Sequence, residues 1–372
     1  MKSVLFLIRT LNMGGAEHVL VDIANRLAQD GFSVTVQTMI DEGYYRKKLE
    51  ANVHYRGGFR SRYSLAKKIV MRLYWLLPGK TISKFIIGKG YTHLVAFTEG
   101  YPTKIIAGCC KRKAKKIAWV HTDLYSNYET VNVFHSEKKN RKCYECFDHI
   151  ICVSNDAKSG YEKRMGTHKS IRVQYNPLNK LEIVAKAQAK AEYIIEDAEA
   201  VKIIAIGRLE KIKGFDLLIE AMNAVRRRVN RPVKLYIIGG GCEKEALNQQ
   251  ILKFGLQDIV KLCGPQGNPY SIMSQCDMQV IPSRAEGYSL VLCEGHFLGL
   301  PVVATKCAGP VEIMKNSRGG ILVDISPEAL ADGIVQMVND EKMLSECKKN
   351  VAKWSENYDV DAVYKQIEAV FD

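Results

Sequence analysis

Residues 201–221 read VKIIAIGRLEKIKGFDLLIEA and contain, in order, an apolar run, a turn with glycine and lysine, and an amphipathic segment. The apolar run at Val201–Ile206 predicts a buried β-strand, and the apolar spacing across Gly214–Arg228 predicts a helix. A strand that passes through a tight turn into a helix is the repeating unit of a parallel β-sheet. This stretch therefore predicts an α/β fold.

The same alternation continues along most of the chain, as in a doubly wound parallel sheet. In the first half we expect strands at Val4–Ile8, 34–38, Leu94–Phe97, Ile117–Val120, Ile150–Val153 and Ile171–Gln174, with a helix through Val19, Ile23 and Leu27. In the second half we expect further strands at Val233–Ile238, Ile259–Leu262, Met278–Ile281, Val302–Ala304 and Gly320–Val323, and helices at Lys244–Phe254, Leu290–Gly299, Pro327–Asn339 and Lys342–Trp354.

The alternation breaks near Asn176-Pro177, which precedes a polar, alanine-rich helix at 180–191 and is typical of a linker. A chain of 372 residues is long enough for two domains. We expect two Rossmann-like domains, at 1–178 and 179–355, that face a central cleft. Ligands of such sheets bind beyond the carboxyl ends of the strands.

Composition excludes several classes of protein. No run of 18 apolar residues is present, so no segment is expected to span a membrane, and the apolar run Val4–Ile8 is too short for a secretory signal. Eleven scattered cysteines are typical of a reducing cytoplasm. Cys143 and Cys146 form a C-x-x-C pair without a second pair, and we interpret them as helical cysteines rather than zinc ligands.

The net charge of +14 is unevenly distributed. Residues 1–180 carry +17, whereas residues 181–372 carry −3. A basic excess of this kind indicates nucleic acid, a membrane surface or an anionic ligand as the partner.

Two glycine-containing turns could bind phosphate. Gly14 and Gly15 follow the first strand and open a helix, whose N-terminus offers free N–H groups to an anion, although a plain tight turn explains them equally well. Arg208 and Lys213 flank the turn after 201–206 and could hold a diphosphate from two sides. The alternative is that both are solvated loop cations.

Two glutamates lie eight residues apart at a strand-to-helix turn. Glu286 lies in the loop, whereas Glu294 lies one turn inside the next helix among apolar neighbours. A buried carboxylate is costly unless a ligand or hydrogen bond compensates, so both are candidate site residues. The backbone N–H groups of residues 287–290 are expected to face the same cleft.

In these motifs the chain resembles the retaining glycosyltransferases of family 4, which have the GT-B fold. The resemblance covers nearly the whole chain and is carried by Gly14-Gly15-Ala16-Glu17, Gly207-Arg208-Leu209 with Lys213-Gly214, the E-x7-E pair Glu286 and Glu294, Gly299-Leu300-Pro301-Val302, Gly309-Pro310-Val311-Glu312, and His121-Thr122-Asp123. Tyr288-Ser289 replaces the more usual Phe-Gly or Phe-Pro, and the loop Cys307-Ala308-Gly309-Pro310 lacks a second glycine. Because of both departures, the motifs do not identify the sugar of the donor.

The resemblance implies a division of labour. The first domain would bind the acceptor, the second would bind a nucleotide sugar, most often a UDP-sugar, and the C-terminal helix at about 356–372 would cross back onto the first. Glu294 would hold the ribose hydroxyls, Glu286 would contact the sugar, and His121 would lie near the reacting face. The implied catalytic residues are His121, Arg208, Lys213 and Glu286, and the implied donor-binding residues are Gly14, Gly15, Arg208, Lys213, Gly264, Glu286, Gly287, Tyr288, Ser289, Leu290 and Glu294.

No D-x-D motif follows a strand end, since Asp359-Val360-Asp361 is C-terminal. We therefore expect no metal and no cofactor, and assign stabilisation of the leaving diphosphate to Arg208, Lys213 and helix N–H groups. Retention by a front-face route, in which the leaving phosphate accepts the acceptor's proton, is implied by the resemblance.

The region from Arg46 to Gly90 holds twelve Lys and Arg residues and one acid. Within it, residues 59–77 place Leu65, Ile69, Leu73 and Leu76 on one helical face with cations beside it and Trp75 near its end. Such a helix either lies on anionic lipid or packs its apolar face into the core. The basic run Lys111–Lys116 would assist on a membrane.

We therefore expect a cytoplasmic enzyme, peripheral on the inner face of the plasma membrane. It would transfer a hexose or N-acetylhexosamine to a lipid-linked saccharide in polysaccharide or cell-envelope glycan synthesis. A soluble or protein acceptor, a nucleotide-sugar epimerase or phosphorylase of similar architecture, and a non-enzymatic basic binder are the alternatives. Aromatic residues are not interleaved with the cations, so nucleic acid is not an expected partner. The sequence leaves the oligomeric state open.

Overall fold

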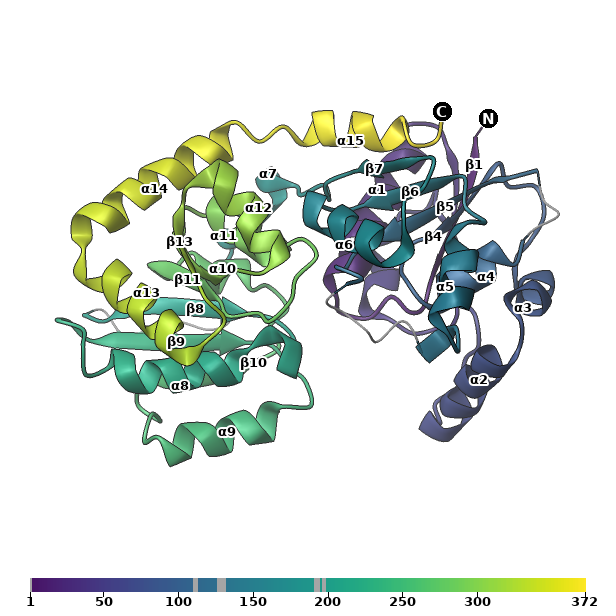
Figure 1. Cartoon of the computed structure of the whole chain (residues 1–372). Helices are drawn as coiled ribbons and strands as arrows, with labels where there is room; N and C mark the ends of the chain where they lie inside the picture. The colour runs from purple at the N-terminus through teal and green to yellow at the C-terminus, as the bar shows by residue number, and fades with distance from the viewer. Residues whose placement is uncertain (1, 110–112, 126–131, 191–194, 196–198) are drawn as a thin grey trace. The chain divides into compact units, whose positions relative to one another are not determined.

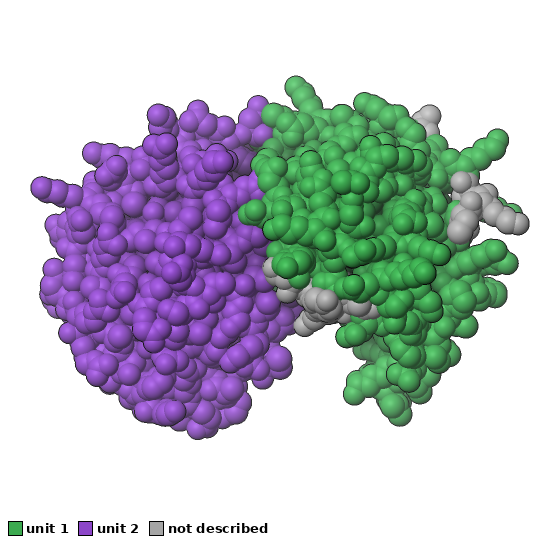
Figure 2. All heavy atoms as spheres, in the orientation of Figure 1, with its two compact units in different colours: residues 1–177, 360–372 green, residues 178–359 purple. Residues whose placement is uncertain are grey.

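The chain forms two compact units. The computed structural model describes residues 2–109, 113–125, 132–190, 195 and 199–372. Unit 1 comprises Met1–Pro177 with Val360–Asp372, and unit 2 comprises Leu178–Asp359 (Figure 2). The division falls at the Asn-Pro segment, one residue before the boundary expected at 178.

Unit 1 is built on a seven-stranded parallel sheet in the order β3-β2-β1-β4-β5-β6-β7. The strand order reverses between β1 and β4, as expected for a doubly wound sheet. The edge strand β3 was not predicted, because its three residues form no apolar run. The strands are β1 (Ser3–Ile8), β2 (Ser33–Thr38), β3 (His54–Arg56), β4 (His93–Ala96), β5 (Lys115–Val120), β6 (His149–Cys152) and β7 (Ile171–Val173).

The helices of unit 1 include one that returns from the C-terminal end of the chain. In α15, Asp361 pairs with Arg26 of α1 at 2.8 Å, and beyond the helix the fully buried Phe371 packs edge-on against Phe6 (Figure 1). The C-terminal segment therefore completes the core of unit 1. The helices are α1 (Gly15–Gln29), α2 (Ser64–Leu76), α3 (Gly79–Ile86), α4 (Tyr101–Ala107), α5 (Glu137–Tyr144), α6 (Asn155–Met165) and α15 (Val360–Glu368).

Unit 2 is built on a six-stranded parallel sheet in the order β10-β9-β8-β11-β12-β13. Side chains alternate between its two faces, so that Ile203 packs in one core cluster and Ile204 in the other. The strands are β8 (Val201–Ile206), β9 (Val233–Ile238), β10 (Val260–Gly264), β11 (Met278–Ile281), β12 (Val302–Thr305) and β13 (Gly320–Val323). Four of them have the bounds that the sequence predicted.

Helices cover both faces of this sheet. Residues of α8, α9 and α13 pack in the cluster on one face, and residues of α7 and α10–α12 pack in the cluster on the other (Figure 1). The helices are α7 (Lys180–Ala187), α8 (Phe215–Val225), α9 (Lys244–Lys253), α10 (Tyr270–Met273), α11 (Leu290–Phe297), α12 (Ala308–Ser317), α13 (Pro327–Asn339) and α14 (Glu341–Glu356).

The sequence interpretation of Cys307-Ala308-Gly309-Pro310 as a loop was wrong. Cys307 is the N-cap of α12, and Gly309 and Pro310 lie in its first turn. A proline is tolerated there because the first N–H groups of a helix have no intrahelical partner. In the described part of the chain, no helix is both long and apolar enough to cross a membrane.

Candidate active site

Lys213 and Glu286 meet at the carboxyl ends of two adjacent strands of unit 2. Lys213 ends the 3-10 turn that follows β8, and Glu286 lies in the loop that follows β11. The Lys213 Nζ donates to Glu286 Oε1 at 2.7 Å, and the Ser283 hydroxyl donates to the same oxygen at 2.8 Å. The structure thus joins a cation and an acid that lie 73 residues apart in the sequence.

A glycine allows these two loops to approach. Gly214, directly after Lys213, has a φ of +67°, and a Cβ there would lie 1.9 Å from the Pro282 carbonyl oxygen. Any side chain at this position would push the two loops apart. The glycine in the Lys213-Gly214 motif is therefore required by the packing of the loops.

Arg208 does not join this pair. Its side chain is 59% exposed and donates to Glu210 Oε1 at 2.7 Å. Both residues lie in the turn between β8 and α8, so Arg208 remains at the same sheet edge as Lys213. The expected two-sided arrangement of cations stays a prediction, because reaching a common ligand requires Arg208 to leave Glu210.

Glu294 is buried in the middle of α11. Its side chain accepts a hydrogen bond from the Tyr270 hydroxyl of α10 at 3.1 Å. Burial raises the pKa of Glu294 to about 7, although the Tyr270 hydrogen bond and the charge of Lys186 act in the opposite direction. A carboxyl group poised near neutral pH in this way is typical of a functional site.

The loop before α11 lies close to the first turn of α12. A Cβ on Gly309 would lie 2.9 Å from the Ser289 nitrogen, and the Gly309 N–H donates to the Glu286 carbonyl at 3.4 Å. The Leu290 N–H, which we expected to face an anion, instead donates to the Tyr288 carbonyl at 3.1 Å. That expectation is wrong for Leu290. For Gly287, Tyr288 and Ser289, the expectation that the backbone N–H groups face an anion stays a prediction.

Gly264 ends β10, the strand at the edge of the sheet. Its φ is +70°, and its carbonyl accepts a hydrogen bond from the Gly239 N–H at 3.0 Å. Gly239 in turn packs against Gly207. A Cβ on Gly239 would lie 1.8 Å from the Gly207 carbonyl oxygen. These glycines bring the backbone at the ends of β8, β9 and β10 close together.

The remaining predicted residues belong to unit 1. Gly14 is the N-cap of α1. A Cβ on Gly14 would lie 2.2 Å from a carboxylate oxygen of Glu17. Gly15 is the first residue of the helix. The N-terminus of α1 thus already has an acidic side chain beside it, in the first turn of the helix, where a negative charge is favourable.

His121 follows β5 and is supported by Glu99, which follows the neighbouring strand β4. Glu99 Oε1 accepts hydrogen bonds from the backbone N–H groups of His121 at 2.6 Å and Thr122 at 2.9 Å. Burial lowers the pKa of His121 to about 3, so the imidazole is neutral at physiological pH. Among the described residues, its buried Nε2 has no hydrogen-bond partner.

Sequence reasoning missed Glu99 and Tyr270. Burial raises the pKa of Glu99, and hydrogen bonds from backbone N–H groups oppose that shift. A charged residue within three residues of the end of an apolar parallel strand was the available signal for Glu99. Tyr270 carried no such signal, because it lies in a four-residue helix that the sequence did not predict.

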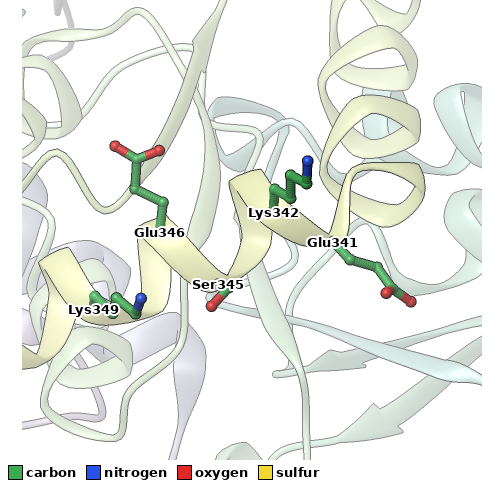
Figure 3. Close-up of a pocket in the computed structure, with 5 residues that line it drawn as sticks. All are labelled: Glu341, Lys342, Ser345, Glu346 and Lys349. Carbon is green, nitrogen blue, oxygen red and sulfur yellow. The ribbon is translucent and has the colours of Figure 1, made fainter.

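A surface hollow along α14 is separate from these residues. It is lined by Glu341, Lys342, Ser345, Glu346 and Lys349, which all come from one helix (Figure 3). Glu341 and Glu346 point away from each other rather than toward a common centre. Within the described ranges, no group of three His, Cys, Asp or Glu side chains is arranged to hold a metal ion.

Comparison with known proteins agrees with this architecture. The family model described as Glycosyltransferase Family 4 matches residues 13–180, and the model described as Glycosyl transferases group 1 matches residues 188–354. A lipopolysaccharide core biosynthesis glycosyltransferase, LpsD of Rhizobium meliloti, is 26% identical over 90% of this chain and 87% of its own length. An N-acetylgalactosaminyltransferase of Campylobacter jejuni, whose name specifies a diphospho-undecaprenol acceptor, is 35% identical over 41% of this chain and 40% of its own.

The fold has close counterparts among solved structures. HepE of Anabaena, crystallised with UDP-glucose, superposes with a TM-score of 0.77 over 100% of this chain and 99% of its own, at 21% identity. Two Rossmann-like units that each match a glycosyltransferase model define an enzyme of the GT-B class. The chain belongs to family 4 of the glycosyltransferases.

Proposed function

We propose that this glycosyltransferase is retaining and metal-independent, and that it transfers a hexose or N-acetylhexosamine from a UDP-sugar to a membrane-lipid-linked saccharide. The product would belong to polysaccharide or cell-envelope glycan synthesis. The observation that carries the proposal is the Lys213–Glu286 pair at the carboxyl ends of β8 and β11, with Glu294 one helix turn beyond. This is the edge of a parallel sheet at which nucleotides bind.

Lys213 is the cation that would meet the donor diphosphate. Its side chain is 23% exposed and its ammonium pairs with the Glu286 carboxylate, so a diphosphate can replace Glu286 as its partner. Glu286 would then be released to accept hydrogen bonds from sugar hydroxyls. Arg208, which pairs with the partly exposed Glu210 carboxylate, would add a second cation.

Glu294 would accept hydrogen bonds from the two ribose hydroxyls. A diol supplies the two donors that a buried carboxylate lacks, and its binding would restore the ionised state that burial disfavours. HepE, which shares the fold, was crystallised with UDP-glucose, and this supports uridine as the base.

In the transfer step, the bond between the anomeric carbon and the leaving phosphate oxygen breaks, and a bond to the acceptor oxygen forms on the same face. The acceptor's proton passes to the leaving phosphate oxygen. Lys213 and Arg208 would stabilise the negative charge that develops on the diphosphate, a role that is worth several kcal/mol in a water-poor site. These cations support a reaction that needs no bound metal.

The acceptor is proposed to be lipid-linked, with the enzyme peripheral on the inner face of the plasma membrane. None of the thirteen residues that the structure describes in α2 is buried. Its apolar side chains are 69% exposed at Leu65, 54% at Ile69 and 57% at Leu76, so the alternative of a core-packed face is wrong. Exposed Lys68 and Arg72 lie on the same helix and would attract anionic lipid.

Two details of the expected membrane helix were wrong. Trp75 is not a free anchor, because its Nε1 donates to the Asn132 carbonyl at 2.8 Å and its ring packs against His135 in a tilted arrangement. Lys67 pairs with Glu42 instead of facing outward. In the run Lys111–Lys116, residues 111 and 112 lie outside the described residues, and the Lys115 Nζ donates to the Asp372 carbonyl.

The relatives support a lipid-linked acceptor in the same sense. LpsD is named for lipopolysaccharide core biosynthesis, and the Campylobacter enzyme is named for an undecaprenol-linked acceptor. A soluble or protein acceptor remains the alternative to be tested, as does epimerase activity.

The test is a thermal-shift panel of nucleotide sugars, followed by transfer assays in EDTA with the donor that stabilises most. A ligand at 100 times its Kd raises the free energy of unfolding by about 2.7 kcal/mol. The proposal expects a UDP-sugar to give the largest shift and sugar to pass to a lipid-linked saccharide. Stabilisation only by other nucleotides contradicts the UDP assignment, and an epimerised donor formed without any acceptor contradicts transfer.

A further inference from the structure

An ion pair outside the proposed chemistry joins the two loops of the donor site. Asp216 lies in the first turn of α8, and Arg284 lies in the loop after β11. The Arg284 guanidinium donates to both Asp216 oxygens, at 2.7 and 2.8 Å. Such a bidentate contact fixes the relative orientation of the two side chains as well as their distance.

The pair is partly shielded and further braced. The side chains of Asp216 and Arg284 are only 20% and 28% exposed, and the Lys211 Nζ donates to Asp216 at 2.6 Å. Burial acts to raise the pKa of Asp216, but the hydrogen bonds from Arg284 and Lys211 outweigh it and lower the pKa to about 2. The carboxylate is therefore charged at neutral and mildly acidic pH.

The backbone reinforces the same connection. The Arg284 N–H donates to the Ile212 carbonyl at 2.8 Å, and its guanidinium donates to the Lys211 carbonyl at 2.6 Å. Together with the close approach of Gly214 to Pro282, these bonds bind residues 211–216 to residues 282–286.

Each of the two joined segments carries one residue of the proposed donor site. Lys213 lies between Lys211 and Asp216, and Glu286 lies two residues after Arg284. The Lys213 side chain donates to Glu286, which also accepts from Ser283, so among the described residues neither Asp216 nor Arg284 is a side-chain hydrogen-bond partner of this pair. Any effect on them must therefore pass through the backbone.

We propose that Asp216 and Arg284 are positioning residues that hold the Lys213 loop and the Glu286 loop as one unit of the donor site. The inference rests on the proposed function, since it assumes that Lys213 and Glu286 act on the donor. A misplacement of about 1 Å in such a site is enough to slow a reaction about a hundredfold. Loss of the pair should therefore reduce kcat/KM for the donor without removing a group that touches the donor.

The experiment uses Asp216→Asn, Arg284→Lys and the double variant in the full chain. Asp332→Asn is the matched control, because Asp332 of α13 pairs at 2.7 Å with Arg228, which lies in the turn after α8. Amide hydrogen exchange of residues 211–216 and 282–287 is measured without ligand, and kcat and KM for the donor are measured separately. Lysine keeps the positive charge of Arg284 but cannot form the bidentate contact of its guanidinium group.

We expect faster exchange in both segments for either single variant and a fall of about ten- to thirtyfold in kcat/KM, with most of the loss in KM for the donor. The double variant should be no worse than the poorer single variant, because both changes break one contact. The control should match the wild type in both readouts.

Three results would overturn the proposal. Unchanged exchange in both segments would show that the pair does not hold the loops, whatever the activity. Losses that simply add in the double variant would show that the two residues act independently. Faster exchange with a normal kcat/KM for the donor in Asp216→Asn would end the positioning role. If the kcat/KM of Lys213→Ala were also normal, the donor site itself would be wrong.

Discussion

At the residue scale, the candidate site pairs the charge of a lysine with that of a glutamate. Lys213 and Glu286 lie 2.7 Å apart, with side chains 23% and 13% exposed. A donor that separates them replaces one charge-assisted contact with others, so breaking the ion pair costs little binding free energy. Glu294 differs, because its partner in the structure is the neutral Tyr270 hydroxyl.

Glu294 is predicted to give nucleotide binding a pH dependence. Its pKa, raised by burial to about 7, lies above the ordinary value of 4.5, so folding favours the protonated form. This carboxyl group therefore lowers stability as pH rises from 4.5 through about 7, and a ligand that needs the carboxylate must displace a proton below pH 7. UDP should bind about fivefold more weakly at pH 6 than at pH 7 on this account.

The measurement is calorimetric titration of UDP into the wild type and Glu294→Gln from pH 5.5 to 8. Because UDP itself titrates, the ratio of the two affinities is the quantity to follow. The ratio should favour the wild type at pH 8 and shrink as pH falls. A ratio that stays constant across the range would show that Glu294 does not exchange its proton on binding.

The two glutamates should separate in function. Glu294→Gln should weaken binding of bare UDP, whereas Glu286→Gln should leave UDP binding near normal and reduce transfer, since free UDP carries no sugar. Titration of UDP and turnover of the donor are compared in both variants. Equal losses of UDP affinity in the two would contradict this division.

At the scale of elements, α2 is the part of unit 1 that carries an exposed apolar face. It extends from the sheet between β3 and α3 (Figure 1). Lys104 closes its C-terminal end by donating to the carbonyls of Tyr74 and Trp75 at 2.9 and 2.8 Å. The helix is thus fixed at its end while its apolar side chains face outward.

Membrane binding is predicted to depend on this face. Ile69→Ser with Leu76→Ser should reduce flotation with anionic vesicles at all salt concentrations, whereas Lys68→Glu with Arg72→Glu should act mainly at low salt, where screening is weak. Exposed Leu181 in unit 2, changed to Ser, controls for hydrophobicity, and Lys348→Glu with Lys349→Glu controls for charge. Equal flotation of all variants would remove α2 from the account.

At the scale of the whole molecule, the chain's last residues complete the fold of its first unit. Phe371 is fully buried against Phe6, Phe32 and His93, and Arg172 donates to the Ala369 carbonyl at 3.4 Å. The chain therefore forms most of the first unit, then the second unit, and then returns to the first.

Phe371→Ala should lower the free energy of unfolding of unit 1 by about 3–5 kcal/mol, as for other buried aromatic residues. Leu252→Ala, at a side chain that is 54% exposed in unit 2, should change it by less than about 0.5 kcal/mol. Denaturant unfolding followed by unit-specific hydrogen exchange measures both. Identical stability of Phe371→Ala and wild type would show that the segment is not part of the core.

The sequence could predict most strands and the candidate acids, because buried parallel strands are continuous apolar runs. It could not predict β3 or α10, which are short, or the Asp216–Arg284 pair, whose members lie 68 residues apart. It also misjudged Lys67 and Trp75, since helical spacing gives the face of a side chain but not its partner. Long-range contacts of this kind come only from the fold.

The central claim is that Lys213 stabilises the leaving diphosphate in place of a metal. Its most direct test is the rate of sugar transfer at saturating donor in EDTA, for the wild type and for folded Lys213→Ala. We predict full wild-type turnover in EDTA and a loss of about a hundred- to thousandfold in the variant. A variant rate close to the wild type, or wild-type activity that needs added magnesium or manganese, would contradict the account.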